Sequence, residues 1–341
     1  MISPPVLHVT DPHFHNFKMF STIIDGMSSR LFYTVQAWKK AVKIGIDNNC
    51  KVMTCSGDIF HVRGHLRPSI YNVVFDLFNE TVNAGLEIVL IAGNHDFENF
   101  YGNDTAIDKL DQIGGVHVLK NNNLLNLHGM VFGGISYCHN TDLFKEKFTN
   151  LCLVKADYIL THQYIDDYLG IPAAATGLSL EFLTKTKNPK TVVLNGHSHC
   201  PAHGKGTNVI DVGAPMGQSF SDTGKYGCWV TDGESKFYEI EDQPKFITIE
   251  KFPKGGEGIK GNYVRIKADS GSAALKIRQK CEIQGSIGII SEVVKEYKAE
   301  AGKTIKISSK DRMLSEYIDV SGGAYQENKE AIMKLYDEIC S

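Results

Sequence analysis

Short apolar runs alternate with longer amphipathic stretches over the first two-thirds of the chain. The stretches 31–46 and 69–84 carry apolar residues at helical spacing, as in Leu31, Val35 and Trp38, and predict helices. The short runs predict buried strands over 6–10, 51–56, 87–92, 157–161, 191–195 and 209–212. Strands that alternate with helices in this way are typical of a layered α/β domain.

A hairpin signal interrupts the alternation. Apolar runs over 123–127 and 130–134 flank the pair His128-Gly129, which favours a tight turn between antiparallel strands. We therefore expect the sheet of this domain to be mixed rather than wholly parallel.

The pattern changes after residue 244, where it predicts a small α+β domain over 245–300. Strands, a helix and a glycine-rich loop are expected within it, at 246–252, 263–267 and 287–294, at 272–281, and at 255–261. The polar segment 302–310 predicts a linker, and apolar residues at helical spacing beyond it predict a helical tail. The expected boundaries are therefore 1–244, 245–300 and 301–341.

Composition places the chain among ordinary globular proteins. Its 341 residues suffice for about two domains, and 42% are hydrophobic and 22% charged. No apolar run approaches the roughly 18–20 residues of a membrane span, and the start, Met-Ile-Ser-Pro-Pro, lacks the features of a signal peptide. The eight cysteines include no C-x-x-C pair, which favours reduced thiols and a cytoplasmic location.

The formal net charge of −3 speaks against a nucleic-acid-binding protein, but it hides three unequal segments. Residues 1–244 carry 19 basic and 25 acidic groups, residues 245–310 carry 14 and 7, and residues 311–341 carry 3 and 7. The basic segment predicts contacts with a DNA backbone, for which the candidates are Lys251, Lys254, Lys260, Arg265 and Lys267. The alternative for each lysine is a solvated surface position.

The histidines point to a metal centre in the first two-thirds of the chain. All 13 lie between His8 and His203. Acidic residues, histidines and one asparagine follow five predicted strands, in the runs Asp11-Pro12-His13, Gly57-Asp58, Gly93-Asn94-His95-Asp96, His162 and Gly196-His197-Ser198-His199. Such side chains suit divalent Mn, Fe or Zn, and an aspartate bridging two cations would make a two-metal site. Asp-x-His alone is more often a surface turn; the five runs together favour the metal site.

This set of motifs resembles the calcineurin-like metallophosphoesterase superfamily. The run Gly57-Asp58-Ile59-Phe60-His61 is similar to that of SbcD-type recombination nucleases, most of all the phage-encoded exonuclease subunits of T-even and T-five-like phages. The Gly-Asp-x-Val-Asp-Arg-Gly run of Ser/Thr phosphatases is absent. The resemblance implies a four-layer sandwich of mixed sheets flanked by helices, with a small α+β capping domain and a C-terminal helical tail.

The resemblance also implies a role for each motif residue. The first metal would be held by Asp11, His13, Asp58 and His199, and the second by Asp58, Asn94, His162 and His197, with Asp58 bridging. His95 would contact the scissile phosphate and protonate or stabilise the leaving oxygen, while Asp96 orients its ring. His61 would contact phosphate and help to place the DNA strand.

The function implied is a double-strand exonuclease and single-strand endonuclease with two divalent ions, Mn²⁺ preferred and Mg²⁺ possible. It would be the catalytic subunit of an SbcCD-like DNA repair and recombination complex, dimeric, with its tail docked on an SMC-like ABC ATPase of the SbcC type. A phage-encoded protein would act in the host cytoplasm. The alternatives are a phosphatase or phosphodiesterase acting on another substrate, and a non-catalytic scaffold of the same fold.

One departure from the nuclease pattern affects the first loop. Phe14-His15 follows Asp-x-His where relatives often have Leu-Gly, which puts the substrate pose in doubt but not the ligands. His15 and His203 are candidates for further phosphate contacts. His8, within the first strand, is expected to be a core residue, and surface or loop positions are expected for His65, His117, His128 and His139.

Overall fold

The computed structural model describes residues 3–99, 104–120, 123–166, 178–204, 206–222 and 224–293. The chain divides into one unit at Met1–Val294 and another at Lys295–Ser341. The predicted linker and tail over 301–341 lie outside the described residues.

The first of two six-stranded sheets contains three of the predicted strands, those at 6–10, 51–56 and 87–92, parallel to one another. Its order is β14-β13-β1-β4-β5-β6, with β1, β4, β5 and β6 parallel and the last two strands of the domain antiparallel at one edge. The bounds are β1 (Val6–Val9), β4 (Val52–Cys55), β5 (Glu87–Leu90), β6 (Val116–Val118), β13 (Gly227–Asp232) and β14 (Glu234–Glu239).

The second sheet has the order β11-β12-β10-β9-β8-β7. Its strands are β7 (Leu124–Leu127), β8 (Met130–Ile135), β9 (Tyr158–His162), β10 (Val192–Gly196), β11 (Ala202–His203) and β12 (Val209–Asp211). β7 and β8 pair antiparallel, and the turn between them has φ of 51° at His128 and 78° at Gly129. The predicted hairpin and mixed sheet are therefore confirmed.

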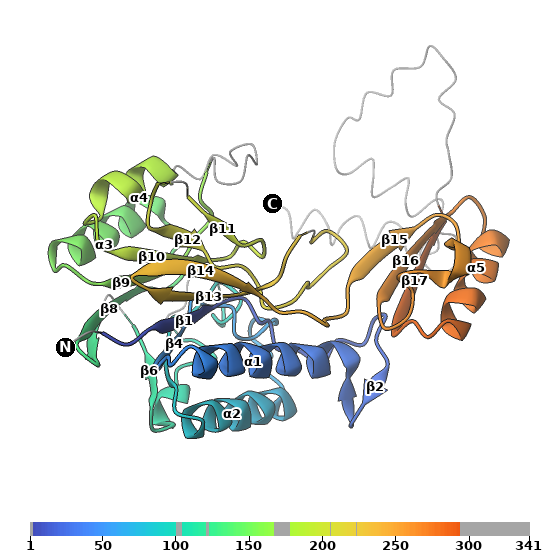
Figure 1. The fold of residues 1–341 in the computed structure, drawn as a ribbon, viewed down its shortest axis with the longest axis horizontal. Coiled ribbons are helices and arrows are strands. Elements are labelled where there is room, and N and C mark those ends of the chain that lie inside the picture. The colour runs from blue at the N-terminus through green and yellow to red at the C-terminus, as the bar shows by residue number, and fades with distance from the viewer. Residues whose placement is uncertain are drawn as a thin grey trace, which may run out of the picture. The chain divides into compact units, whose positions relative to one another are not determined.

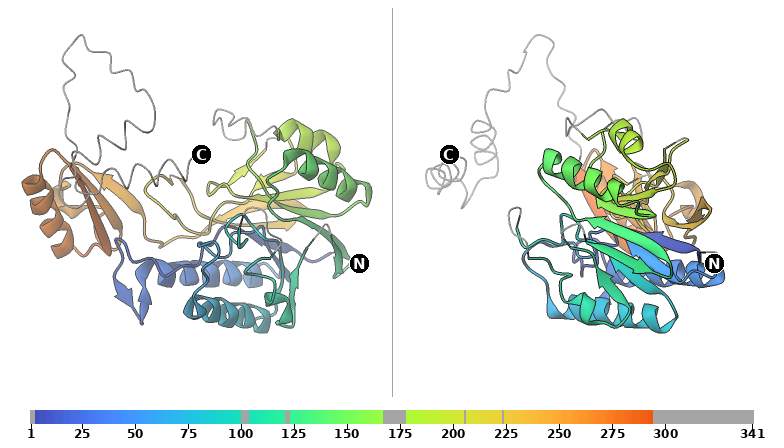
Figure 2. Two further views of the ribbon diagram at one scale, coloured as in Figure 1. Left: turned by 180° about the vertical axis from the view of Figure 1, so that it is seen from behind. Right: turned by 90° about the vertical axis from the view of Figure 1, so that its left-hand side faces the viewer.

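The two sheets pack face to face and carry helices on their outer faces. Val52 and Val89 of the first sheet meet Phe132 and Leu160 of the second in one buried cluster. The helices are α1 (Ser29–Asp47) and α2 (Pro68–Asn83) on the first sheet, and α3 (Thr141–Leu153) and α4 (Leu180–Thr186) on the second. Figure 1 and the end-on view in Figure 2 show this four-layer order, which confirms the predicted fold.

The two long helices owe their positions to an apolar face and a capped start. Ser28 accepts a hydrogen bond from the Leu31 N–H at the beginning of α1, which satisfies one of the free donors there. The Trp38 ring is fully buried and stacks on Phe78 of α2 at 5.2 Å between centroids. The indole N–H donates to Thr81 Oγ1 at 3.0 Å, so its polar atom is paired inside the core.

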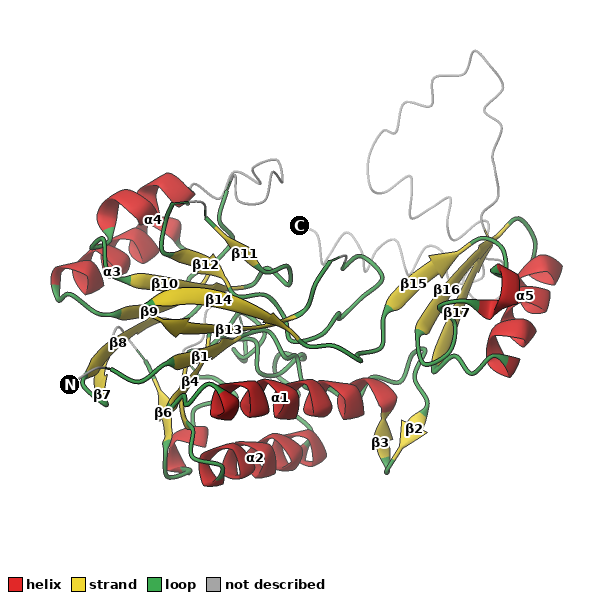
Figure 3. Ribbon diagram, in the orientation of Figure 1, coloured by secondary structure: helices red, strands yellow, loops and turns green. Residues whose placement is uncertain are grey.

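The small lobe after residue 244 is a three-stranded parallel sheet with one helix. It contains β15 (Phe246–Ile249), β16 (Tyr263–Ala268), α5 (Gly271–Ile283) and β17 (Gly288–Val293). Val264, Ile266 and Ala268 pack in one cluster with α5 residues, and Figure 3 shows α5 covering one face of the sheet. Because side chains alternate along a strand, Arg265 and Lys267 of β16 lie on the other face.

Shorter elements complete the described chain. They are the hairpin β2 (Ile23–Ile24) and β3 (Met27–Ser28), and the 3-10 turns η1 (Leu110–Gln112) and η2 (Lys254–Gly256). Among the helices of the described residues, none is long and apolar enough to cross a membrane.

His8 gives the fold a pH dependence that can be measured. Its ring is fully buried in β1, between the hydroxyls of Thr54 and Thr231 at 2.9 Å each. Burial lowers the pKa of His8 to about 3. The unfolded chain therefore binds more protons than the folded one between about pH 6.5 and 3, and stability falls as the pH falls through that range.

Replacing His8 by Gln is expected to remove this part of the acid sensitivity. The free energy of unfolding of the parent should decrease more steeply than that of the variant between about pH 6.5 and 4, in denaturant titrations at each pH. The exposed His203→Gln serves as the matched control. Parallel pH profiles for parent and His8→Gln would contradict the assignment.

Candidate metal centre

The loops after five parallel strands bring all seven predicted metal ligands to one edge of the sandwich. The first sheet contributes Asp11, His13, Asp58 and Asn94 after β1, β4 and β5, and the second contributes His162, His197 and His199 from the ends of β9 and β10. The first two loops pair through backbone hydrogen bonds from Asp11 N to Gly57 O and from His13 N to Asp58 O. The His197 N–H donates to Asp11 Oδ2 at 3.0 Å and so joins the two sheets.

Four of the seven ligands have a backbone conformation that side chains rarely adopt. The φ angles are 51° at Asp11, 46° at His13, 51° at Asp58 and 84° at His197. A non-glycine residue in this region costs on the order of 1–3 kcal/mol, and such residues concentrate at functional sites. The positive φ angles turn the backbone sharply at each strand end, which directs these side chains toward one another.

One half of the centre lies around His13. Its Nε2 atom is 3.2 Å from His199 Nε2, 3.5 Å from Asp58 Oδ2 and 3.9 Å from Asp11 Oδ1. Ligand atoms of Asp11, His13 and His199 all lie within 4.8 Å of one another. Together with Asp58, these three residues are the predicted first-metal set.

The other half lies around His162. Its Nε2 atom is 3.1 Å from Asn94 Oδ1 and 3.4 Å from Asp58 Oδ2, while His197 Nδ1 is 3.0 Å from the same Asn94 oxygen. His162 Nδ1 donates to the Ser56 carbonyl at 2.6 Å, which turns Nε2 toward the carboxylates. Asp58 Oδ2 thus lies between the two halves, as a bridging carboxylate must.

The protonation states favour cation binding. Burial lowers the pKa of His13 well below its usual range and that of His197 to about 4, so both imidazoles keep a free lone pair at neutral pH. Burial alone would raise the pKa of Asp58, but the neighbouring His162 and His13 hold it well below its usual range. Burial likewise opposes protonation of His162, yet Asp58 raises its pKa to about 9.

These residues fit divalent metal ions. Two carboxylates, one amide oxygen and four imidazoles converge in a buried space, with Asp11 and His162 fully buried and His13 3% exposed. With its pKa raised to about 9, His162 is expected to carry a proton next to the Asp58 carboxylate at neutral pH when no metal is bound. Metal binding is therefore expected to release that proton.

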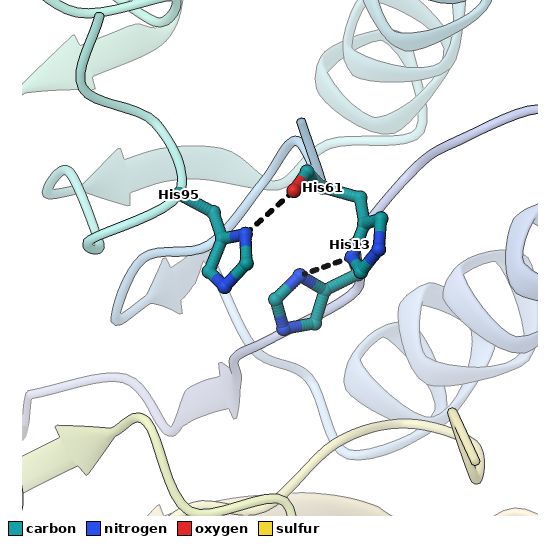
Figure 4. Close-up of side chains that lie close together, drawn as sticks. All are labelled: His13, His61 and His95. Atoms are coloured by element: carbon teal, nitrogen blue, oxygen red, sulfur yellow. Dashed lines mark hydrogen bonds between the residues drawn. The ribbon is translucent and has the colours of Figure 1, made fainter. Parts of the chain in front are cut away.

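His95 and His61 lie beside the ligands (Figure 4). His95 Nδ1 donates to the His61 carbonyl at 2.5 Å, which leaves Nε2 as the atom available to a substrate. The rings of His61 and His95 stack at 5.4 Å, and a 3.4 Å hydrogen bond joins the Nδ1 atoms of His61 and His13. Both histidines are therefore at the centre, as the sequence predicts.

The predicted role of Asp96 is wrong. Its carboxylate accepts the backbone N–H groups of Ile59, Phe60 and Gly93, and the His95 ring is oriented instead by the His61 carbonyl. Asp96 is buried, and burial raises its pKa to about 7. It holds together the two loops that carry Asp58 and Asn94.

Several residues near the centre are not predicted by the sequence. Asp222 Oδ2 lies 3.3 Å from His199 Nδ1, Arg63 Nε donates to the Asn94 carbonyl at 2.7 Å, and Tyr137 stacks on His197 at 6.2 Å. Carboxylate, arginine and tyrosine in loops give no spacing signal. The motif run could have drawn attention only to Arg63, two residues beyond His61.

The histidines outside the predicted ligand set lie at different places. His15 is near the centre, His203 is engaged elsewhere, and His117 and His128 are surface residues, as expected. His15 lies 5.6 Å from the His61 ring, whereas His203 is exposed and its Nε2 donates to the Thr207 carbonyl. His117 and His128 both contact Glu87 on the surface. His15 therefore remains a candidate for phosphate contact, and the engagement of His203 elsewhere disfavours that role for it.

The five basic candidates divide between two parts of the small lobe. Lys251, Lys254 and Lys260 are exposed in the loop between β15 and β16, and Arg265 and Lys267 are half-buried on the face of β16 opposite α5. Arg265 Nε donates to Thr248 Oγ1 at 3.0 Å, and its guanidinium lies 5.1 Å from the Phe220 ring centroid.

A family model matches the part of the chain that contains the metal centre. It is described as calcineurin-like phosphoesterase and covers residues 4–201, which include all seven ligands.

Individual relatives are distant. An uncharacterized protein, R555, of Acanthamoeba polyphaga mimivirus is 27% identical over 117 residues, which are 32% of this chain and 8% of that protein. The chain thus spans a small fraction of this curated relative. The crystal structure of TT1561 of Thermus thermophilus is 14% identical, covers 70% of this chain and 99% of its own, and has a TM-score of 0.44. That of the Pseudomonas putida nuclease MPE is 18% identical, covers 57% and 61%, and has a TM-score of 0.27.

Proposed function

The chain belongs to the calcineurin-like phosphoesterase family, whose members are metal-dependent phosphoester hydrolases, and on that premise we propose that it is a DNA nuclease. It acts as a double-strand exonuclease and single-strand endonuclease, as the catalytic subunit of an SbcCD-like complex. The observation that carries the proposal is His61, which distinguishes SbcD-type nucleases from Ser/Thr phosphatases. The His61 ring is hydrogen-bonded to the predicted metal ligand His13 and stacks on the His95 ring.

The chemistry follows from the residues around the scissile phosphate. Divalent cations would be held by Asp11, His13, Asp58, Asn94, His162, His197 and His199. When bound they would supply positive charge for the phosphate oxygens and would lower the pKa of water to near neutral pH. His95 Nε2 gives a proton to the leaving oxygen while its Nδ1–H stays on the His61 carbonyl, so the ring cannot rotate away. The His95 backbone N–H donates to Asp58 Oδ1 at 2.8 Å and fixes the histidine to the bridging ligand.

The donor set supports Mn²⁺ as the working metal, with Mg²⁺ as the alternative. Carboxylate and amide oxygens suit both ions, but four imidazoles favour a transition metal over Mg²⁺.

The dimer and the docking of an SMC-like ATPase on the 311–341 tail remain proposals. Co-purification with such an ATPase should be lost when that tail is deleted.

The proposal is tested with labelled duplex and single-stranded DNA in the presence of Mn²⁺. We expect both substrates to be cut, and His95→Gln to cut them at least about a hundredfold more slowly, since general acid catalysis contributes at least that factor. An aryl phosphodiester with a good leaving group needs less protonation, so its hydrolysis should fall less in the same variant. Intact DNA alongside a hydrolysed aryl phosphodiester would favour a phosphodiesterase on another substrate.

The basic side chains of β16 in the small lobe support a DNA substrate. Lys267→Glu is expected to raise KM for DNA several-fold and to lower the salt dependence of KM by about one unit of log–log slope, because one phosphate contact is lost. Activity on the aryl phosphodiester should not change. Lys276→Glu, on the exposed side of α5, is the matched control of equal charge change. Equal effects of the two substitutions would point to net charge alone.

A further inference from the structure

The loop 213–222, between β12 and β13, contacts three parts of the molecule: His199, the Asp11-to-His13 segment and the small lobe. It contains Gly213 at its start and Asp222 at its end, and it lies beside the metal centre. The Ala214 N–H donates to the carbonyl of His199 at 3.0 Å, so the loop begins against the last metal ligand. Three of its side chains then make separate contacts.

Asp222 holds the ring of His199. Its Oδ2 accepts from His199 Nδ1 at 3.3 Å, from the Gln218 N–H at 2.7 Å and from the Ser219 N–H at 3.2 Å. Its Oδ1 accepts from Ser219 Oγ at 2.9 Å. Hydrogen bonds from Gln218 and Ser219 of the same loop therefore fix the orientation of the carboxylate. The side chain is only 12% exposed. A carboxylate on Nδ1 leaves Nε2 of His199 directed at His13 and the first-metal set.

Gln218 contacts the other source of first-metal ligands. Its side-chain amide donates to the carbonyl of Pro12, between Asp11 and His13, at 3.3 Å. Its own backbone carbonyl accepts from Arg30 Nη2 at 2.6 Å. Arg30 is buried, and its guanidinium lies 3.6 Å from the centroid of the Phe17 ring. The same loop thus touches the Asp11-to-His13 segment and the start of α1.

Phe220 contacts the small lobe. Its ring lies 5.1 Å from Phe246 of β15 in an edge-to-face arrangement, and 5.4 Å from Phe20. The Arg265 guanidinium of β16 lies 5.1 Å from the same ring. Only Ser221 separates this residue from Asp222, which contacts His199. A displacement of Phe220 is therefore expected to be transmitted to Asp222.

We propose that the 213–222 loop couples the small lobe to the first-metal half of the centre, with Asp222 as the positioning residue of His199. The small lobe fixes the position of Phe220. Because Phe220 and Asp222 belong to the same tight turn, the position of Phe220 determines that of Asp222. Asp222 in turn sets the direction of His199 Nε2. The proposal rests on the metal centre and not on DNA as the substrate. Metal binding, measured without any substrate, tests it independently of the proposed nuclease function.

The first test measures Mn²⁺ binding to Asp222→Ala and Asp222→Asn by isothermal titration calorimetry. Loss of a carboxylate behind a ligating histidine typically weakens metal affinity roughly 10–100-fold, and we expect a loss of that order at one of two sites for Asp222→Ala. Asp222→Asn keeps an oxygen for His199 Nδ1 and should remain within a few-fold of the parent. Thermal unfolding of the metal-free variants shows whether the fold is intact.

The control is Asp157→Ala, which removes a carboxylate that also accepts a backbone N–H, from Val131, away from the centre. It should leave Mn²⁺ affinity unchanged. Parent-like affinity in Asp222→Ala would overturn the positioning role. So would an equal loss in Asp222→Ala and Asp222→Asn, because a positioning carboxylate should be replaced well by the amide that keeps its geometry.

The second test addresses the coupling. Phe220→Ala removes the contact with the small lobe without changing the chemical identity of any metal ligand or of Asp222. We expect it to weaken Mn²⁺ binding several-fold at the same site. Phe237→Ala is the matched control, because Phe237 is also half-buried but packs on Trp229 in the β13–β14 hairpin. Equal Mn²⁺ affinities of the two variants would overturn the coupling.

Discussion

Replacing Asp58 by Asn is expected to abolish phosphodiester hydrolysis and to remove most of the affinity for Mn²⁺. Asp58 Oδ2 lies 3.5 Å from His13 Nε2 and 3.4 Å from His162 Nε2, so one oxygen serves both halves of the centre. An amide supplies no charge, and its NH₂ group would face either these nitrogens or the His95 N–H. We expect hydrolysis to fall by on the order of 10³-fold, as for loss of a principal electrostatic group.

The metal-free variant should nevertheless fold. The buried carboxylates of Asp11 and Asp58 repel each other, and their interaction is one cause that raises the pKa of Asp11, after burial, to about 6. Removing one charge relieves that repulsion, although it also leaves the protonated His162 with one fewer carboxylate. Metal content per chain, hydrolysis rate and thermal unfolding should be measured together with Asp157→Asn as control. Two bound ions and parent-like hydrolysis in Asp58→Asn would contradict the bridging role.

The fold was predictable where a single segment contains its own signal. The predicted strands at 6–10 and 51–56 match β1 and β4 because both faces of these strands are covered, which favours mostly apolar runs. The polar exceptions, His8 and Thr54, pair with each other. The β13–β14 hairpin was missed. Its Asp232-Gly233 turn is a recognisable signal, but its place beside β1 depends on pairing between distant parts of the chain, as in Val6 with Thr231.

The candidate ligands were predictable for a geometric reason. Parallel strands end at the same edge of a sheet, so polar residues directly after several strands must lie near one another. Asp11, Asp58 and Asn94 of the first sheet are therefore expected to lie together. Strand order alone does not place the ends of β9 and β10 of the second sheet at that edge, whereas the resemblance implies it.

The partners of the ligands could not be predicted. The resemblance implied that Asp96 orients the His95 ring, yet the Asp96 carboxylate accepts hydrogen bonds from three backbone N–H groups. Asp222 contacts His199 from 23 residues away, through the course of a loop. Such contacts depend on loop conformation, for which the sequence contains no period and no fixed spacing.

Gly93→Ala is expected to damage the centre nearly as much as loss of a ligand, although it changes no functional group. A Cβ at residue 93 would overlap the backbone nitrogen and the carboxylate of Asp58. Neither can move freely, because the Asp58 carbonyl accepts from His13 N and its Oδ1 accepts from His95 N. The methyl group therefore has to displace Asp58 from the place where it bridges the two halves.

Both stability and activity should respond. Overpacking of this kind costs about 1–3 kcal/mol, which corresponds to roughly 2–4 °C in Tm per kcal/mol for a domain of this size. A displacement of about 1 Å in a reacting group costs on the order of 10²-fold in rate, so hydrolysis should fall by at least that factor even at temperatures where the variant is folded. Gly114→Ala is the control, because its Cβ would meet nothing within 4 Å. Hydrolysis in Gly93→Ala that matches Gly114→Ala would mean that Asp58 can shift without loss, and the bridging carboxylate would then have to be sought elsewhere, first at Asp11.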